Sequence, residues 1–371
     1  MKFINWADIH ESKRRGALWF FLKLLSIAYG LAVKVRFYVY NMGLIKIRSL
    51  PAYVVSVGNI TVGGTGKTPF VAMLAGWAAE NGFRAAILSR GYGGKRNSGV
   101  IVVSDGTKIM ASVDDAGDEP ILLARKLSTV PVLISKKRYL AGDLASERFG
   151  AELMLLDDGY QHLSVHRNLN ILLLDAKRRF GNGSLLPLGP LREPLEQMER
   201  ADLVVITKCN DEHRGDELVD FVQRRFPGKP IFRAGHFPDR VMFPRVGKEH
   251  PVDFLAEKRV VAFAGVAQPR DFLDTVKSLK ADVIHFEAFS DHHRFKQAEI
   301  AALVSEKKHL GGDLLLTTEK DWVRIDGRID VGDGIAVLAI RAGLLSDSDL
   351  FFDMIRQRIT RSRESFGNYG I

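Results

Sequence analysis

The sequence contains a single cysteine, Cys209, among its 371 residues. One thiol cannot form an internal disulfide or a multi-cysteine zinc site, so disulfide-rich scaffolds and such zinc modules are excluded. Low-complexity tracts and short repeats are also missing. Apolar residues make up 46% and charged residues 26%, which is typical of a folded chain and excludes disordered or collagen-like proteins. The length is sufficient for two domains.

Outside its first fifty residues the chain has almost no net charge. Residues 1–50 carry nine Lys or Arg against two acids, so they hold +7 of the formal +9 and leave +2 for the other 321 residues. A general nucleic-acid surface would require basic residues over the body of the protein. The distribution therefore argues against a nucleic-acid partner and concentrates the basic character at the N-terminal end.

One long apolar run, residues 16–33, lies in this basic segment and is interrupted only by Lys23. It is about as long as a membrane span, but a span would place Lys23 near the costly bilayer centre. A signal peptide would need a small-residue cleavage site, which is missing after the run. We favour a helix lying in the membrane interface, with a span and a buried core helix as alternatives. The interfacial helix would immerse its bulky side chains in the headgroup region: Trp19, Phe20, Phe21, Leu24 and Leu25.

After Pro51 the pattern changes to short apolar runs that alternate with amphipathic stretches. Near-continuous apolar strands alternating with helices predict an α/β fold with a parallel sheet covered on both faces. The expected strands are 53–57, 85–89, 100–103, 132–134, 153–157, 171–174, 203–207, 260–264, 283–286, 314–317 and 335–340. The expected helices lie near 69–81, 137–148, 213–225, 269–279, 297–307 and 346–359.

A glycine-rich stretch follows the first expected strand and precedes the first expected helix of this series. It reads Gly63-Gly64-Thr65-Gly66-Lys67-Thr68, and this context is the one that a phosphate-binding P-loop requires. Glycines let backbone amides approach phosphate oxygens, and the helix N-terminus favours negative charge. Lys67 can bridge terminal phosphates, and Thr68 can ligate Mg²⁺. Thr61 stands where the usual pattern has its first glycine, so the context rather than the full motif predicts nucleotide binding.

An acidic pair ends the expected strand 153–157. Asp157 and Asp158 emerge at its carboxyl end, where ligands bind in open α/β sheets, and could hold Mg²⁺ beside the P-loop. Gln161 and His162 extend this polar cluster. Asp175 ends another expected strand and is a weaker candidate, because a strand-end cap explains it as well.

Five prolines lie between residues 226 and 251. Prolines at this density are typical of connecting segments and predict an inter-domain connection here. We therefore divide the chain into three parts. Residues 1–50 form an N-terminal membrane-interface helical segment, residues 51–235 a P-loop core, and residues 236–371 a second, smaller α/β domain that closes over the active site.

Six short motifs occur in one order along nearly the whole chain, and together they resemble the tetraacyldisaccharide 4′-kinase family, the lipid A 4′-kinases. The resemblance implies a P-loop kinase that transfers the γ-phosphoryl group of ATP, with Mg²⁺, to the 4′-hydroxyl of a tetraacylated glucosamine disaccharide 1-phosphate. It also implies the cytoplasmic face of the bacterial inner membrane, an anionic lipid surface and an amphipathic membrane-associated N-terminal helix. The motifs lie at residues 62–69, 89–93, 117–120, 157–162, 181–194 and 318–321.

The same resemblance implies roles at the acceptor side of the reaction. Asp118 resembles the catalytic base, although from the sequence alone it is only a carboxylate in a loop. His292 resembles the histidine that works with this aspartate, and His293 is an adjacent competitor. Because His292 lies in the second half of the chain, we expect the pair to form only when the two domains close.

The resemblance further implies a Mg²⁺ site built from Asp157 or Asp158 with Thr68 and Glu193. Around it we expect four polar residues that contact the metal ligands or the substrate: Arg90, Gln161, His162 and Arg192. Each of the two arginines could bind a phosphate, and each could equally be a turn residue or half of a solvated ion pair.

Two other classes of P-loop protein compete with a lipid kinase. A GTPase-like switch would carry an aspartate in its guanine-reading motif, and residues 207–210 lack one, so ATP is preferred. A partition ATPase would carry an early lysine in the phosphate loop, where this chain has Val62. A nucleic-acid ATPase is disfavoured by the nearly neutral body.

Overall fold

The structure is a computed structural model that describes residues 16–92, 94, 99–209, 213–330 and 334–367, with side chains to residue 362. Three features named above lie partly outside the described residues: the first fifteen residues of the basic segment, Gly93 in the second motif, and Asn210.

One mixed sheet runs through the whole molecule in the order β11-β10-β12-β13-β8-β7-β6-β1-β5-β2-β4-β3, with β9 paired to β8. Most neighbouring strands are parallel, as predicted, and the antiparallel pairs are β3 with β4, β13 with β8, and β8 with β9. The strands in chain order are β1 (Tyr53–Gly58), β2 (Ala85–Ser89), β3 (Ile101–Ser104), β4 (Val132–Ile134), β5 (Leu153–Asp157), β6 (Leu169–Asp175), β7 (Leu203–Thr207), β8 (Ile231–Phe243), β9 (Lys248–His250), β10 (Arg259–Ala264), β11 (Asp282–Ala288), β12 (Leu314–Thr318) and β13 (Ile335–Leu344).

Helices cover both faces of the sheet. Alternate residues of its buried strands point to opposite faces and pack into two separate hydrophobic cores, each lined by its own helices. In β5, for example, Leu155 packs with α3, whereas Met154 packs with α6. The helices are α2 (Ala17–Asn41), α3 (Lys67–Glu80), α4 (Val113–Ala116), α5 (Asp118–Lys126), α6 (Arg138–Phe149), η1 (Leu195–Arg200), α7 (Asp216–Arg225), η2 (Val252–Leu255), α8 (Pro269–Ser278), α9 (Gln297–His309), α10 (Glu319–Ile325) and α11 (Ser348–Gly367).

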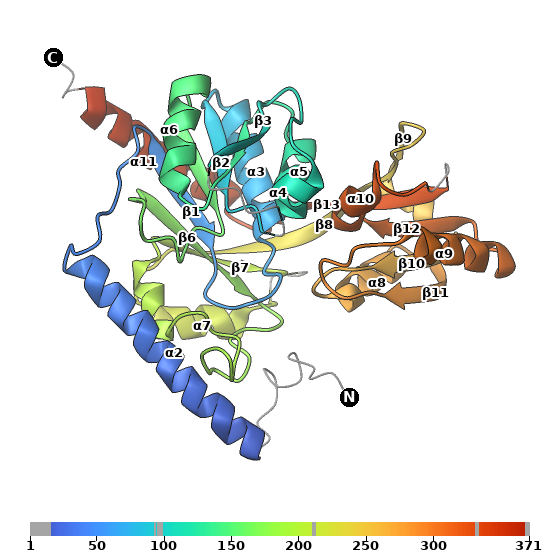
Figure 1. Ribbon diagram of the computed structural model, residues 1–371, viewed down its shortest axis with the longest axis horizontal. Coiled ribbons are helices and arrows are strands. Elements are labelled where there is room, and N and C mark those ends of the chain that lie inside the picture. The colour runs from blue at the N-terminus through green and yellow to red at the C-terminus, as the bar shows by residue number, and fades with distance from the viewer. Residues whose placement is uncertain (1–15, 93, 95–98, 210–212, 331–333, 368–371) are drawn as a thin grey trace.

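Strand β8 occupies most of the stretch in which the prolines predict an inter-domain connection, so the chain is a regular strand there. Its first residues pair with β7, and its later residues pair with β13. Figure 1 shows this long strand crossing from one half of the molecule to the other. Pro238 is tolerated because it lies at a register shift, where no ladder amide is needed. The domain division at 235/236 falls inside this strand and stays a prediction.

The C-terminal helix α11 packs with the core formed by residues of the first half of the chain. The Phe351 ring lies 6.0 Å from Phe70 of α3 and 5.0 Å from Phe232 of β8, in edge-to-face geometry. Phe351 is fully buried, and Ile355 and Ile359 extend the same contact. The last helix thus returns to the P-loop half of the molecule (Figure 1).

Helix α2 runs along one edge of the molecule (Figure 1). Most of its apolar side chains are exposed. Its buried residues are Leu22, Ser26 and Gly30, which are four residues apart and form one narrow stripe. A Cβ on Gly30 would lie 2.8 Å from Leu185, so the glycine permits the close approach. The alternative of a buried core helix is therefore wrong. The helix is long and apolar enough to cross a membrane by length and composition.

Replacement of Phe351 by alanine should destabilise the protein by about 3–5 kcal/mol, because a large buried ring is removed between two other rings. Urea unfolding monitored by circular dichroism would measure the loss. Leu350, its neighbour on the same helix, has 56% of its surface exposed, so Leu350→Ala is the matched control and should cost far less. Equal losses for the two variants would contradict this packing.

Candidate active site

The glycine-rich stretch forms the expected loop between β1 and α3. Gly63 and Gly66 have φ angles of 103° and 81°, in the region that side-chain-bearing residues avoid. A Cβ on Gly66 would also collide with the ring of His236. The carbonyl of Thr65 accepts a hydrogen bond of 2.8 Å from the Thr207 hydroxyl, which anchors the loop to β7. The loop therefore presents its amides at the start of α3, as anion binding requires.

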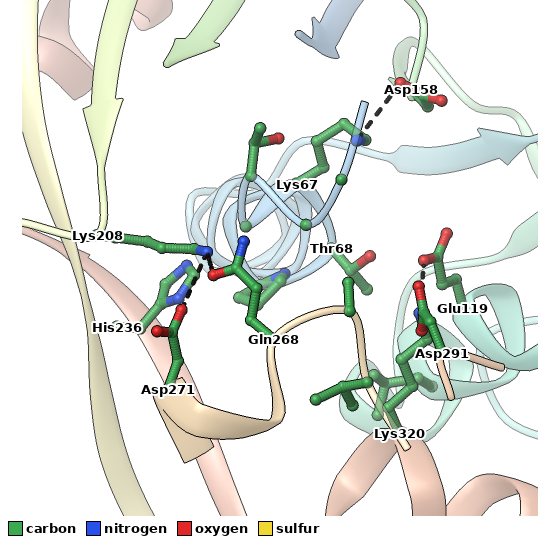
Figure 2. Close-up of a pocket in the computed structure, with 18 of the residues that line it drawn as sticks. Lys67, Thr68, Glu119, Asp158, Lys208, His236, Gln268, Asp271, Asp291 and Lys320 are labelled. Atoms are coloured by element: carbon green, nitrogen blue, oxygen red, sulfur yellow. Dashed lines mark hydrogen bonds and ion pairs between the residues drawn. The ribbon is translucent and has the colours of Figure 1, made fainter. Parts of the chain in front are cut away.

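Lys67, the first residue of α3, points away from the helix towards the acidic strand end. Its Nζ lies 3.3 Å from Asn59 Oδ1 and 3.6 Å from Asp158 Oδ1 (Figure 2). Asn59 is buried and also donates to the Thr61 carbonyl at 2.8 Å. No sequence motif singles out Asn59, which lies directly after β1. Thr68 follows in the first turn and lines the same cavity.

The two adjacent aspartates at the end of β5 have opposite environments. Asp157 pairs in register with Val57 of the P-loop strand and is buried, and Ser89 donates to it at 3.2 Å. Burial, together with the nearby charges of Glu119 and Asp158, raises the Asp157 pKa. Asp158 is only partly buried, with 15% of its side chain exposed, and the positive charges of Lys67 and Arg192 outweigh its desolvation and lower its pKa to about 2. The neighbours therefore favour a proton on one carboxyl and a charge on the other.

Glu193, the remaining predicted metal ligand, is directed elsewhere. It is buried, and its Oε2 accepts a hydrogen bond of 2.5 Å from Arg200. Burial raises the Glu193 pKa, and Arg200 opposes that effect. Glu119 is instead the acid whose charge acts on Asp157 from across the cavity. No motif other than the short Gly-Asp-Glu-Pro run could have drawn attention to Glu119.

Within the described ranges, no three His, Cys, Asp or Glu side chains converge closely enough to hold a metal by themselves. Mg²⁺ in kinases takes only one or two carboxylates and completes its shell with water and substrate phosphates. The charged Asp158, the buried Asp157 and the Thr68 hydroxyl beside the loop fit that requirement. These three residues would hold Mg²⁺ against the phosphates, where the ion would neutralise charge on the transferred group.

Asp118 is the first residue of α5 rather than part of a loop. The preceding Gly117 has a φ of 88°, and a Cβ there would collide with the Tyr92 carbonyl. Asp118 is buried, and its Oδ2 lies 2.9 Å from Nδ1 of His292. The pair is therefore formed in this structure without further closure of the two halves. The competitor His293 instead contacts Glu299 at 2.9 Å.

Hydrogen bonds and charges control the proton affinities of this pair. Burial alone would raise the Asp118 pKa, but the hydrogen bond from His292 and the charges of Lys320 and Arg324 lower it strongly. The His292 pKa is raised, chiefly by its hydrogen bond with Asp118. Asp118 thus remains a carboxylate, and the His292 side chain is half exposed to the cavity.

A group of arginines lies on the other side of the acidic pair. Arg192 donates to both Asp158 oxygens, at 3.0 and 2.9 Å. Arg138 is buried and contacts His162 Nδ1 at 3.1 Å, while its Nε has no hydrogen-bond partner. Burial, followed by the charge of Arg138, lowers the His162 pKa to about 3, so His162 is neutral. Arg90 donates to the Tyr92 hydroxyl at 2.7 Å.

Gln161 connects these groups to the P-loop strand. Its side-chain amide donates to the backbone carbonyl of Asn59 at 2.8 Å. Its backbone carbonyl accepts a hydrogen bond of 2.7 Å from Arg36 of α2. All the predicted site residues except Asp118, Asp157 and Glu193 line one cavity of about 1510 Å³.

Figure 2 shows the two sides of this cavity. The P-loop, Lys67 and Asp158 face Glu119, Asp291 and Lys320, while Lys208, Gln268 and Asp271 close the opposite end. Lys208 contacts Gln268 and lies 3.4 Å from Asp271. The cavity is thus built from both halves of the chain.

The chain is similar to known proteins over most of its length. The family model described as tetraacyldisaccharide-1-P 4′-kinase matches residues 18–360. The chain belongs to this family. A tetraacyldisaccharide 4′-kinase of Syntrophus aciditrophicus is 40% identical over 86% of this chain and 88% of its own length. The Geobacter metallireducens enzyme of that name is 42% identical over 82% and 88%.

A solved structure is similar over almost the entire fold. The crystal structure of LpxK from Aquifex aeolicus in complex with ATP is 34% identical, with a TM-score of 0.73, and the match covers 92% of this chain and 99% of that chain. The predicted fold class, an α/β core with a mostly parallel sheet and an N-terminal apolar helix, is confirmed.

Replacement of Lys67 by alanine should weaken Mg²⁺–ATP binding and abolish phosphoryl transfer, because the loop loses the cation that reaches the terminal phosphates. Isothermal calorimetry with ATP and a transfer assay with labelled ATP would measure the two effects. Lys229, which donates to the Ala201 carbonyl far from the cavity lining, offers Lys229→Ala as the control. ATP binding of wild-type strength in the Lys67 variant would contradict this assignment.

Proposed function

We propose that this kinase transfers the γ-phosphoryl group of ATP to the 4′-hydroxyl of a tetraacylated glucosamine disaccharide 1-phosphate at a membrane surface. The observation that carries the proposal is the shared cavity: a P-loop with its acidic strand end faces an Asp118–His292 pair supplied from both halves of the chain. Phosphoryl transfer needs little more than positioning, charge neutralisation and a proton acceptor.

At the nucleotide end, the loop amides between Gly63 and Thr68 and the Lys67 ammonium would bind the phosphates. Asp158, whose Oδ1 lies 3.6 Å from the Lys67 ammonium, would keep Lys67 directed towards the phosphate site. Mg²⁺ on Thr68 and the aspartate pair would draw charge from the transferred group. The charge of Asp158 and the raised pKa of Asp157 suit a site whose negative charge increases only when a divalent ion binds.

At the acceptor end, we place the proton acceptor at Nε2 of His292, with Asp118 behind it. Asp118 has no proton to donate, so Nδ1 of His292 must carry the hydrogen between them, and Nε2 is left to take one from the hydroxyl. His292 lines the cavity, whereas Asp118 is buried behind it. This refines the expectation that Asp118 itself meets the hydroxyl.

The arginine side of the cavity suits the phosphate that the acceptor already carries. Arg138 is buried there with Nε unpaired, and Arg90 and Arg36 line the same wall. A buried guanidinium with unused hydrogen-bonding capacity favours an anion. Since His162 beside it is neutral, the positive charge of this wall comes from its arginines. This wall would hold the 1-phosphate while the 4′-hydroxyl, at the opposite end of the disaccharide, reaches His292.

We further propose that α2 binds the cytoplasmic face of the bacterial inner membrane as a peripheral helix. Large apolar side chains remain exposed along its whole length, from Phe20 and Phe21 to Leu31 and Val35. Lys23, Lys34 and Arg36 lie among them and would attract anionic headgroups. The Lys23 ammonium lies over the Trp19 ring, 5.1 Å from its centroid, as in an interfacial aromatic and basic pair.

An assay of the purified wild-type chain with labelled phosphate donors tests the proposed reaction. We expect label from ATP, and not from GTP, to appear on the disaccharide lipid. Asp118→Asn should lower kcat by roughly 10²–10⁴-fold with calorimetric ATP binding retained, since a positioned base contributes about that much. Full transfer by the Asp118 variant would remove this residue from the mechanism.

The rate should also depend on pH through His292. Because its pKa is raised above the usual 6.5, the protonated form persists to higher pH than in a free histidine, and kcat/KM should rise with pH as Nε2 loses its proton. A pH–rate profile from pH 5 to 9 would show this rise of kcat/KM on its acid side, which we call the acid limb. His292→Gln should retain a flat residual rate, and an unchanged limb in that variant would show that another group titrates.

Membrane binding is tested on the exposed face of α2 without disturbing its contacts with the core. The triple variant Phe20→Ser, Leu24→Ser, Leu31→Ser should shift the protein from vesicles of anionic phospholipid to the soluble fraction, because exposed apolar area drives interfacial binding. Flotation measures the shift. A control with Met110→Ser, Ile109→Ser and Leu140→Ser removes three exposed apolar groups elsewhere. Unchanged flotation of the helix variant would refute the anchor.

A further inference from the structure

Arg324 is a buried arginine that lies outside every motif considered above. It belongs to α10, in the second half of the chain, and only 5% of its surface is exposed. Its Nε and Nη2 both donate to Oδ2 of Asp118, at 2.7 and 2.5 Å. The atom of Asp118 that contacts His292 is therefore also the one that receives two hydrogen bonds from Arg324.

The guanidinium is itself held on its other side. Nη1 donates to Asp321 Oδ1 at 2.8 Å and to the Gly265 carbonyl at 2.6 Å. Asp321 is fully buried, and its Oδ2 accepts from the Gly265 amide at 3.0 Å and from the Thr318 hydroxyl at 2.7 Å. The planar group is thus fixed by hydrogen bonds from three of its nitrogens, which removes its freedom to rotate.

This network joins the segments that surround the cavity. Gly265 directly follows β10 and precedes Val266 and Ala267, which line the cavity. Asp118 begins α5 in the first half of the chain. The aspartate therefore takes its position relative to the second half from Arg324 as well as from His292.

We infer that Arg324 is a positioning residue for phosphoryl transfer, which fixes the ionised Asp118 carboxylate so that His292 presents Nε2 to the acceptor hydroxyl. The inference rests on the proposed reaction and extends it. A histidine that shared a rotating carboxylate would sample several orientations, and loss of orientation lowers kcat. Arg324 does not line the cavity, so it acts through Asp118 and not on the substrate.

The charge of Arg324 also bears on the proton affinity of the pair. Other charged groups around His292 are Asp118, Asp291 and Lys320, and Lys320 in turn lies 3.1 Å from Glu119. Removing the positive charge of Arg324 would leave the carboxylate less neutralised. His292 would then hold its proton more tightly, and the acid limb of the rate profile would move to higher pH.

The test compares Arg324→Met and Arg324→Lys with wild type in the lipid-kinase assay. We expect kcat to fall at least tenfold in Arg324→Met while KM for ATP stays within about twofold. The acid limb should move upward in this variant. Arg324→Lys keeps the charge but not the planar fork, so it should recover the position of the limb and only part of kcat.

Arg125→Met is the matched control, because Arg125 also joins α5 to the end of α10, through Asp326 at 2.8 Å, but near the surface. It should leave kcat and the pH profile unchanged. If Arg324→Met does not fold, as judged by circular dichroism and ATP calorimetry, Arg324→Lys decides through its kcat. Wild-type kcat and limb in a folded Arg324 variant would overturn the inference, whereas an inactive wild type would instead refute the proposed reaction.

Discussion

The hydrogen-bond ladder of strand β8 is the constraint on which the active site depends. This strand pairs with β7 through its first residues and with β13 through its later ones, so both halves of the chain belong to one sheet. The carboxyl ends of the parallel strands in both halves can then contribute to one cavity. Asp157 ends β5 and Gly265 follows β10, and the Asp118–Arg324 contact closes the distance between the halves. A flexible linker in place of β8 would not hold Asp118 and Arg324 in contact.

Much of the fold and of the nucleotide side could be predicted from the sequence because the signals are local. The P-loop is one continuous run between a strand and a helix, and the aspartate pair directly follows an apolar strand. Strand β8 was missed because its prolines resemble turn signals, and only the register with β13 shows how one of them is tolerated. Asp118 was predicted to lie in a loop because it follows a glycine, Gly117, which is typical of turns. In the structure it begins helix α5.

The rest of the site could not be predicted because it depends on contacts between distant residues. Nothing in the sequence shows that Glu193 is paired with Arg200. The roles of Asn59 and Arg324 likewise follow from neighbours 8 and 206 positions away along the chain. Even the two adjacent aspartates, identical in type, differ because arginine and lysine reach one and burial dominates the other. Charge state is a property of surroundings that a linear pattern does not contain.

Helix α2 is joined to the catalytic machinery by backbone acceptors and not only by apolar packing. Ser26 donates to the Leu185 carbonyl at 2.9 Å, Tyr29 to the Arg192 carbonyl at 2.8 Å, and Arg36 to the Gln161 carbonyl at 2.7 Å. These hydrogen bonds attach the helix to segments that shape the cavity. With the proposed interfacial helix in a leaflet, the cavity mouth is held at a constant height above the lipid. The acceptor then arrives by lateral diffusion, a two-dimensional search in which its acyl chains never enter water.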